Sequence, residues 1–174
     1  MTQEISIQNN TFTMHPSGGM LWHEKRMLLI ADVHLGKVSH FRKHGSAVPL
    51  RAVAANFDQL TRVADYYQAQ SICFLGDLFH SSLNTEWKLF EKWVRSREET
   101  LILIAGNHDI ISPVKYENLN IDIYSEFQSN GFLLTHHPEE REGFFNFCGH
   151  IHPGIRLGGI GRQVLKLSCF FKTE

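Results

Sequence analysis

The sequence contains little cysteine and no long apolar run. Its three cysteines, Cys73, Cys148 and Cys169, are far apart, and none belongs to a Cys-x-x-Cys pair. This usage argues against a disulfide framework and a thiolate zinc site, and it is typical of a reducing compartment. No apolar run approaches the length of a transmembrane helix, and the polar first ten residues carry no signal-peptide pattern. We therefore expect a cytoplasmic protein with no membrane partner.

An excess of one charge sign is also lacking. The chain has 17 Lys and Arg against 18 Asp and Glu, a formal net charge of −1. No global field therefore draws it onto nucleic acid or a membrane, and any basic binding surface must be local. A length of 174 residues is enough for one domain with a full core, and we expect residues 1–174 to form it.

Histidine, in contrast, is frequent, with eleven residues, and several follow short apolar runs that have the composition of buried strands. A single such junction is also compatible with an ordinary turn, because Gly, Asn and Asp are turn formers. The same junction recurs five times, and the carboxyl ends of strands in an α/β sheet can meet at one edge. The candidate residues at these five junctions are Asp32 and His34; Asp77; Asn107, His108 and Asp109; His136; and His150 and His152.

The segments between these runs complete an α/β pattern. Apolar residues at helical spacing predict one amphipathic helix from about Leu50 to Ala69, and a second that begins after Asn84. Gly18 and Gly19 predict a turn between two edge strands, and the glycines of 158–161 predict a hairpin turn. Residues 36–45 read as a basic loop.

The donor set predicts two metal ions. Two Asp, one Asn and four His are too many ligands for one ion, but they suit two adjacent ions bridged by one carboxylate. Imidazole together with carboxylate suits Mn, Fe, Zn, Ni or Co. Two such ions, roughly 3.5–4 Å apart, are a known arrangement for generating hydroxide and attacking phosphorus.

In their order along the chain, Asp-x-His, Gly-Asp, Gly-Asn-His-Asp, a lone His and Gly-His-x-His resemble the calcineurin-like metallophosphoesterases. The resemblance spans residues 32–152 and implies a four-layer α/β/β/α fold, with two mixed sheets between helices. It assigns Asp32, His34, Asp77 and His152 to one ion, and Asp77, Asn107, His136 and His150 to the other, with Asp77 as the bridge. It also implies attack by a metal-bridging hydroxide, with His108 protonating the leaving oxygen and Asp109 orienting His108. Mn is the expected ion, with Fe, Zn, Ni or Co as alternatives.

The stretches His34–Lys37, Phe41–Gly45 and Leu75–Ser81 are similar to a narrower group, the bacterial ligase-associated DNA damage response endonucleases (PdeM). This similarity implies DNA as substrate and DNA-repair proteins as partners. Lys37, Arg42 and Lys43 would then contact the substrate backbone, although a solvated charged loop is the alternative. The chain departs from the group at His137, where relatives usually carry Glu. It also stops at Glu174, where relatives continue, so we expect a domain that is short at its C-terminus and leave the oligomeric state open.

Other functions are compatible with parts of this pattern. The same metal centre serves phosphomonoesterases, phosphatases and cyclic-nucleotide phosphodiesterases. A scaffold that keeps the fold without the chemistry is a further alternative, which the complete ligand set and His108 disfavour. We expect His136, rather than His137, to be the ligand, because His136 directly follows its apolar run. The residue before Pro138 adopts extended geometry, which predicts that the side chain of His137 turns away from that of His136.

Overall fold

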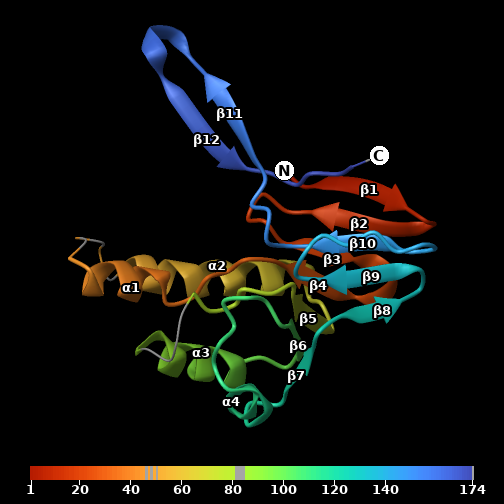
Figure 1. Ribbon diagram of the computed structural model, residues 1–174, viewed down its shortest axis with the longest axis horizontal. Helices are drawn as coiled ribbons and strands as arrows, with labels where there is room; N and C mark the ends of the chain where they lie inside the picture. The colour runs from red at the N-terminus through yellow and green to blue at the C-terminus, as the bar shows by residue number, and fades with distance from the viewer. Residues whose placement is uncertain (46, 48, 50, 81–84, 174) are drawn as a thin grey trace.

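The computed structural model describes residues 1–45, 47, 49, 51–80 and 85–173, and for Lys43 only the backbone. Two mixed sheets, four helices and a separate hairpin make up these residues (Figure 1). The larger sheet has the order β1 (Gln3–Ile7), β2 (Asn10–Met14), β3 (Met20–Trp22), β4 (Met27–Ile30), β5 (Ser71–Phe74), β6 (Thr100–Ile104) and β7 (Ile121–Tyr124). The smaller sheet has the order β10 (Phe145–Cys148), β9 (Phe132–Thr135) and β8 (Phe127–Ser129).

The larger sheet changes from antiparallel to parallel at β4. Strands β1 to β4 pair antiparallel, and the turn at Gly18 and Gly19 joins β2 to β3 as predicted. Strands β4 to β7 pair parallel, which requires crossover connections. These contain α1 (Lys37–Lys43) and α2 (Arg51–Tyr67) after β4, α3 (Thr85–Arg95) after β5 and α4 (Pro113–Glu117) after β6. Strands β4, β5 and β6 are largely buried on both faces, which explains their continuous apolar sequences.

Each face of the larger sheet has its own core. On one face, side chains of α2, α3 and α4, among them Leu60, Phe90 and Tyr116, pack against the sheet. On the other face, Phe12 and Trp22 pack against Phe132 of the smaller sheet, with ring centroids 5.3 and 4.9 Å apart. The polar edge of Trp22 is satisfied, because its indole N–H donates to the side-chain oxygen of Asn10 at 2.8 Å. This aromatic cluster locks the two sheets face to face.

The expected mixed α/β sandwich of two sheets and helices is confirmed. Within the described ranges, however, no helix contributes to the core on the side of the smaller sheet, so the second helical layer of the expected four is not found there. The chain leaves β10 directly for a hairpin, and the connections of the smaller sheet contain no described helix. No described helix is long and apolar enough to span a membrane.

The local structure differs from the sequence-based prediction in the basic segment, while the predicted helices and turn are found with shifted bounds. Residues 36–45 are not a loop throughout, because Lys37–Lys43 form α1. The first long helix is found as Arg51–Tyr67 and the second as Thr85–Arg95, while Leu50 and Asn84 lie outside the described residues. The predicted turn at 158–161 joins β11 (Gly154–Gly158) to β12 (Val164–Ser168), with a short 3₁₀ turn between them.

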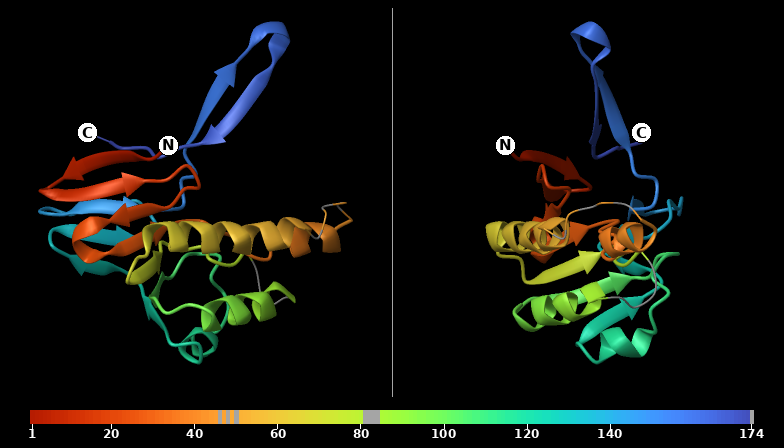
Figure 2. Two further views of the ribbon diagram at one scale, coloured as in Figure 1. Left: turned by 180° about the vertical axis from the view of Figure 1, so that it is seen from behind. Right: turned by 90° about the vertical axis from the view of Figure 1, so that its left-hand side faces the viewer.

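The hairpin of β11 and β12 projects away from both sheets (Figures 1 and 2). Among the described strands, β11 and β12 pair only with each other, and every residue from Gly154 to Ser168 is exposed. An isolated two-stranded hairpin is marginally stable in water. Neither hydrophobic core contains a residue of this hairpin, so packing against the rest of the described chain does little to stabilise it.

A buried carboxylate of α3 holds the beginning of α1. The Oε2 atom of Glu86 accepts a hydrogen bond from the backbone N–H of Gly36 at 2.8 Å. Its Oε1 atom accepts from the backbone N–H and the hydroxyl of Ser39 at 3.1 and 2.6 Å. Gly36 itself caps α1 with no side chain, so a carboxylate from another helix satisfies the free N–H groups of its first turn. Glu86 thereby fixes the segment that follows His34.

Replacement Glu86→Ala should lower the free energy of unfolding by about 3 kcal/mol, because hydrogen bonds to charged groups are strong. The buried donor of Gly36 and the two partly buried donors of Ser39 would lose their acceptor. Urea unfolding followed by circular dichroism measures this loss. Glu98→Ala, on the exposed turn before β6, is the matched control and should change stability by less than about 0.5 kcal/mol. Equal stability of the two variants would show that water replaces the carboxylate at no cost.

Candidate metal centre

All five predicted junctions lie at one edge of the sandwich. The parallel strands β4, β5 and β6 end together, and the parallel pair β9 and β10 of the smaller sheet ends beside them. Backbone hydrogen bonds continue past the strands and fix the loops. The N–H of His34 donates to the carbonyl of Asp77 at 2.9 Å, and the N–H of Gly149 donates to that of His136 at 3.1 Å. The fold thus brings together side chains that are 120 residues apart in sequence.

The first group of possible ligands consists of Asp32, His34 and His152, whose donor atoms lie within 4.8 Å of one another. The Nε2 atoms of His34 and His152 are 3.3 Å apart, and the Nε2 atom of His152 lies 3.5 Å from an Asp32 oxygen. The backbone N–H of His150 donates to both Asp32 oxygens at 3.0 Å. These contacts orient the carboxylate toward the two rings.

The second group lies on the other side of Asp77 and includes Asn107 and His136. The Nε2 atom of His136 is 2.9 Å from the side-chain oxygen of Asn107 and 3.4 Å from Oδ1 of Asp77. The Nδ1 atom of the same ring lies 3.1 Å from the carbonyl oxygen of Leu75. A carbonyl can only accept, so Nδ1 donates to it, and when Nδ1 carries the only ring proton Nε2 presents its lone pair to the centre.

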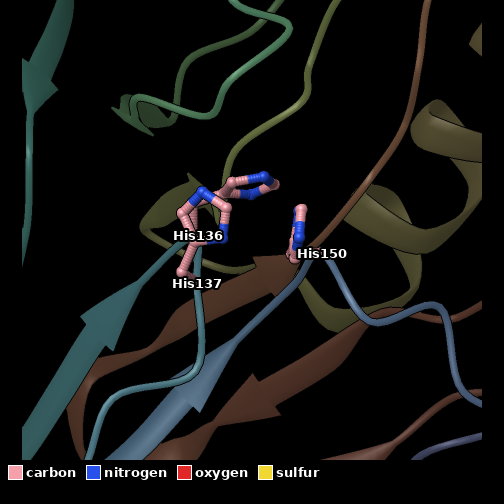
Figure 3. A group of neighbouring side chains, drawn as sticks. All are labelled: His136, His137 and His150. Atoms are coloured by element: carbon pink, nitrogen blue, oxygen red, sulfur yellow. The ribbon is translucent and has the colours of Figure 1, made fainter.

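His137 belongs to the same cluster. His136, His137 and His150 have donor atoms within 4.8 Å of one another, and Figure 3 shows the three rings where the chain leaves β9 and β10. The rings of His137 and His150 have centroids 4.1 Å apart, and those of His136 and His137 are 4.8 Å apart. The prediction that His137 turns away from His136 is therefore wrong. The rings of His136 and His137 both contact that of His150 instead.

Asp77 occupies the centre of the cluster. Only 2% of its surface is exposed, like that of His136. One carboxylate oxygen faces His136, while the other lies 3.9 Å from Nε2 of His34. Oδ1 also accepts the backbone N–H of His108 at 2.9 Å. The carboxylate therefore lies between the two groups and offers a different oxygen to each.

The backbone at this edge is held in an uncommon conformation. Five of the seven predicted metal ligands have positive φ: Asp32 (52°), His34 (52°), Asp77 (50°), His150 (68°) and His152 (43°). The left-handed region costs an L-residue roughly 1–2 kcal/mol, and such residues concentrate at functional sites. The interactions of the surrounding fold must offset this strain.

Glycines make room for the donors. A Cβ atom on Gly76 would lie 2.2 Å from Nδ1 of His136, and one on Gly106 would lie 2.4 Å from an Asp77 oxygen. At Gly149 the nearest atoms would be 2.8 Å away, one of them an oxygen of Asp32. Each predicted metal group is thus bordered by a glycine where a side chain would displace a donor atom.

The protonation state of His34 suits a ligand. Burial lowers its pKa to about 4, and the charge of Lys37 also acts in this direction, although Asp77 opposes the shift. The ring is therefore neutral at pH 7, and its lone pair is free. Buried carboxylate oxygens, an amide oxygen and neutral imidazoles together form a donor set that fits divalent transition ions.

His108 lies beside the two groups, with its ring packed against other histidines. Its ring stacks on that of His80 with centroids 5.2 Å apart, and it meets the ring of His34 edge-on at 5.7 Å. Asp109 does not orient His108 as expected. Its two oxygens accept the backbone N–H groups of Phe79 and Gly106 at 3.1 and 2.9 Å. Asp109 is therefore a positioning residue that fixes the loop rather than the ring.

His80 and His137 were not among the predicted site residues. His80 contacts the rings of His34, His40 and His108, and its Nδ1 is buried with no hydrogen-bond partner in the described structure. Burial, followed by the charges of His108 and His40, lowers its pKa. The sequence signals for His80 are its position three residues after Asp77 and its place in the stretch Leu75–Ser81, which resembles the narrower endonuclease group.

The predicted substrate-binding residues lie on α1. Lys37 and Arg42 are exposed, and the charge of Lys37 is among the causes that lower the pKa values of His34 and His80. Lys37 therefore lies near the candidate metal centre. The structure does not describe the side chain of Lys43.

Comparisons with known proteins agree with this geometry. The structure is similar to the crystal structure of a nuclease, MPE, from Pseudomonas putida, with a TM-score of 0.78 and 24% sequence identity. The alignment covers 97% of this chain and 84% of the other, and at this identity it establishes a common fold. No curated protein sequence matches the chain. The sequence profile of the calcineurin-like phosphoesterases matches residues 25–166, which include every residue of the two groups. The chain therefore belongs to the calcineurin-like phosphoesterase family and is a metal-dependent phosphoesterase.

Proposed function

We propose that the protein hydrolyses phosphodiester bonds of nucleic acid, with DNA as the expected substrate and two divalent ions, Mn before Fe, Zn, Ni or Co, as cofactors. The observation that carries this proposal is the position of Asp77 between two groups of donors, with a different oxygen directed to each. A carboxylate in that position suits a bridge between two ions.

The proposed ligands follow from the two groups. Asp32, His34, Asp77 and His152 would hold one ion, and Asp77, Asn107, His136 and His150 the other. When bound, the two ions would supply positive charge that polarises a phosphoryl group and activates water at neutral pH. The protein contributes the fixed donors and the glycine-lined space around them.

His108 is the proposed general acid. Its backbone N–H is bound to Asp77, which fixes the residue beside the centre, while its ring lies outside both ligand groups. A protonated ring nitrogen can donate to the oxygen that leaves phosphorus, and the stacked ring of His80 limits its movement. Asp109 supports this arrangement through the backbone of the same loop.

Two features favour a diester of nucleic acid over a phosphomonoester. A solved structure with the same fold is that of a nuclease. In addition, the exposed cations of α1 follow the first ligand group along the chain, and repeated phosphate contacts strengthen the binding of a polyanion. Partners from DNA repair and a cytoplasmic location remain predictions.

Replacement Asp77→Asn should remove both ions, because a bridging carboxylate contributes to each site. Metal analysis after dialysis should find about two ions per chain in the unmodified protein and few in the variant. Asp58→Asn, on the exposed face of α2, is the control and should retain the full complement. Retention of one ion at unchanged affinity in Asp77→Asn would contradict the bridging role.

The roles of His136 and His137 can be separated in the same way. We expect His136→Ala to lose one ion, because its Nε2 faces both Asp77 and Asn107. His137→Ala should keep both ions, since the ring of His137 is exposed and, among the described residues, makes no hydrogen bond or ion pair with Asp77 or Asn107. The exposed His23→Ala serves as control. Loss of an ion from His137→Ala alone would assign the ligand position to His137.

The function itself is tested by comparing four substrates in the presence of Mn: bis(p-nitrophenyl) phosphate, its monoester, a 2′,3′-cyclic nucleotide and a DNA oligonucleotide. We expect metal-dependent hydrolysis of the diesters. His108→Ala should keep both ions but lower oligonucleotide hydrolysis by about 10²–10⁴-fold, with a smaller loss for the acidic p-nitrophenol leaving group. Preference for the monoester would contradict the proposed diesterase function. An equal loss for all leaving groups would contradict the proposed role of His108 as general acid.

A further inference from the structure

The hairpin of β11 and β12 has two chemically different faces. Residues that pair directly across two strands lie on the same face, and successive residues alternate between faces. One face carries only aliphatic side chains, because Ile155 pairs with Leu167 and Leu157 with Leu165. The other face, which we call the basic face, carries the pairs Gly154 with Ser168, Arg156 with Lys166 and Gly158 with Val164.

The basic face has no internal counter-charge. Arg156 and Lys166 are direct cross-strand partners, and like charges in that position repel each other. Neither they nor Arg162 in the hairpin turn takes part in an ion pair within the described residues. Residues 143–173 contain no Asp or Glu, although they contain four Lys and Arg. The repulsion is therefore uncompensated within the described chain, and an anionic ligand would relieve it.

The basic face also offers free access. Gly154 and Gly158 flank Arg156 on the same face, so no side chain covers the guanidinium from either side along the strand. A Cβ at Gly158 would meet no atom within 4 Å. Glycine at such positions lets a ligand approach the backbone closely, and the planar guanidinium suits the oxygens of a phosphate group.

The hairpin begins at the metal centre. Strand β11 starts two residues after His152, whose ring lies 3.3 Å from that of His34. Since a strand rises about 3.3 Å per residue, Arg156 lies on the order of 13 Å along the chain from His152. A nucleic-acid strand advances about 3.4 Å per phosphate in a duplex, so this span corresponds to a few nucleotides.

We propose that the basic face of the β11–β12 hairpin binds the phosphate backbone of a nucleic-acid strand a few nucleotides from the bond that is cleaved. This proposal rests on the proposed phosphodiesterase function and adds a binding surface separate from α1. Charge complementarity selects the ligand, because the face presents two uncompensated cations beside a centre for phosphate chemistry. The aliphatic face offers no such interaction, and a second copy of the chain is the competing occupant of the hairpin.

The test compares binding with turnover. A fluorescent single-stranded oligonucleotide with a phosphorothioate backbone, which keeps the charges, serves as the probe for fluorescence anisotropy at several salt concentrations. The double variant Arg156→Ala, Lys166→Ala should bind it on the order of tenfold more weakly at 0.1 M salt. The slope of log affinity against log salt should fall by about 1.4, which corresponds to two contacts with a single strand. Turnover of bis(p-nitrophenyl) phosphate should stay unchanged.

Two further variants keep the test decisive. Arg156→Glu, Lys166→Glu should bind more weakly than the alanine pair. Lys92→Ala, Arg95→Ala removes two exposed cations at the end of α3, at the opposite edge of the sheet, and should leave affinity and salt slope unchanged. Equal affinity and slope for the hairpin and α3 variants would overturn the proposal, as would an equal loss of turnover on the small diester.

The remaining outcomes separate this proposal from the proposed function. Hydrolysis of the small diester without any oligonucleotide binding would overturn the hairpin proposal alone. Hairpin-dependent binding without metal-dependent hydrolysis of any diester would overturn the proposed function instead. If Leu157→Ser, Leu165→Ser reduces both the mass in light scattering and the affinity, while the basic-face variants change neither, the hairpin is an interface between copies.

Discussion

The buried carboxylate of Asp77 is the constraint around which this structure is arranged. Transfer of an ionised carboxylate from water to a protein interior costs several kcal/mol unless compensating partners surround it. The described neighbours of Asp77 are a backbone N–H of His108 and the imidazoles of His34 and His136. Burial keeps the His34 ring neutral at pH 7, so that ring supplies little positive charge. Divalent ions would supply the charge that this carboxylate lacks, which gives the cluster a physical reason to bind metal.

The backbone around Asp77 is strained. Five of the predicted ligands lie in the left-handed region, and glycines stand where a Cβ would collide with a donor atom. Such a loop geometry persists only where the elements on both sides are fixed. Here the aromatic cluster of Phe12, Trp22 and Phe132 locks the two sheets together. The packing of this aromatic cluster therefore helps to fix the positions of the predicted metal ligands, although no residue of the cluster is itself a predicted ligand.

The segment after His152 is not buried like the rest of the chain. Every residue of the hairpin is exposed, and its two faces present aliphatic and basic side chains that belong to neither hydrophobic core. The hairpin therefore adds nothing to the two cores. A segment with that composition gains stability from a ligand or a partner rather than from its own fold.

The sequence by itself determined the strands, the order of the polar junctions and the chemistry of the donors. Continuous apolar runs can be recognised because parallel strands are buried on both faces, and Asp32, Asp77 and His136 are recognisable because they directly follow such runs. The family resemblance predicted which donors share a group, although His34 and His152 are far apart in the sequence. Only the tertiary structure shows how these two residues meet, through the packing of two sheets. It also placed His137 beside His150, directed Asp109 to the backbone and stacked His80 on His108. Local propensity carries no information on such contacts, since they depend on where separate strands end relative to one another. For the same reason the sequence did not reveal that Glu86 reaches from α3 to hold α1, or that the chain leaves β10 for an exposed hairpin instead of a second helical layer.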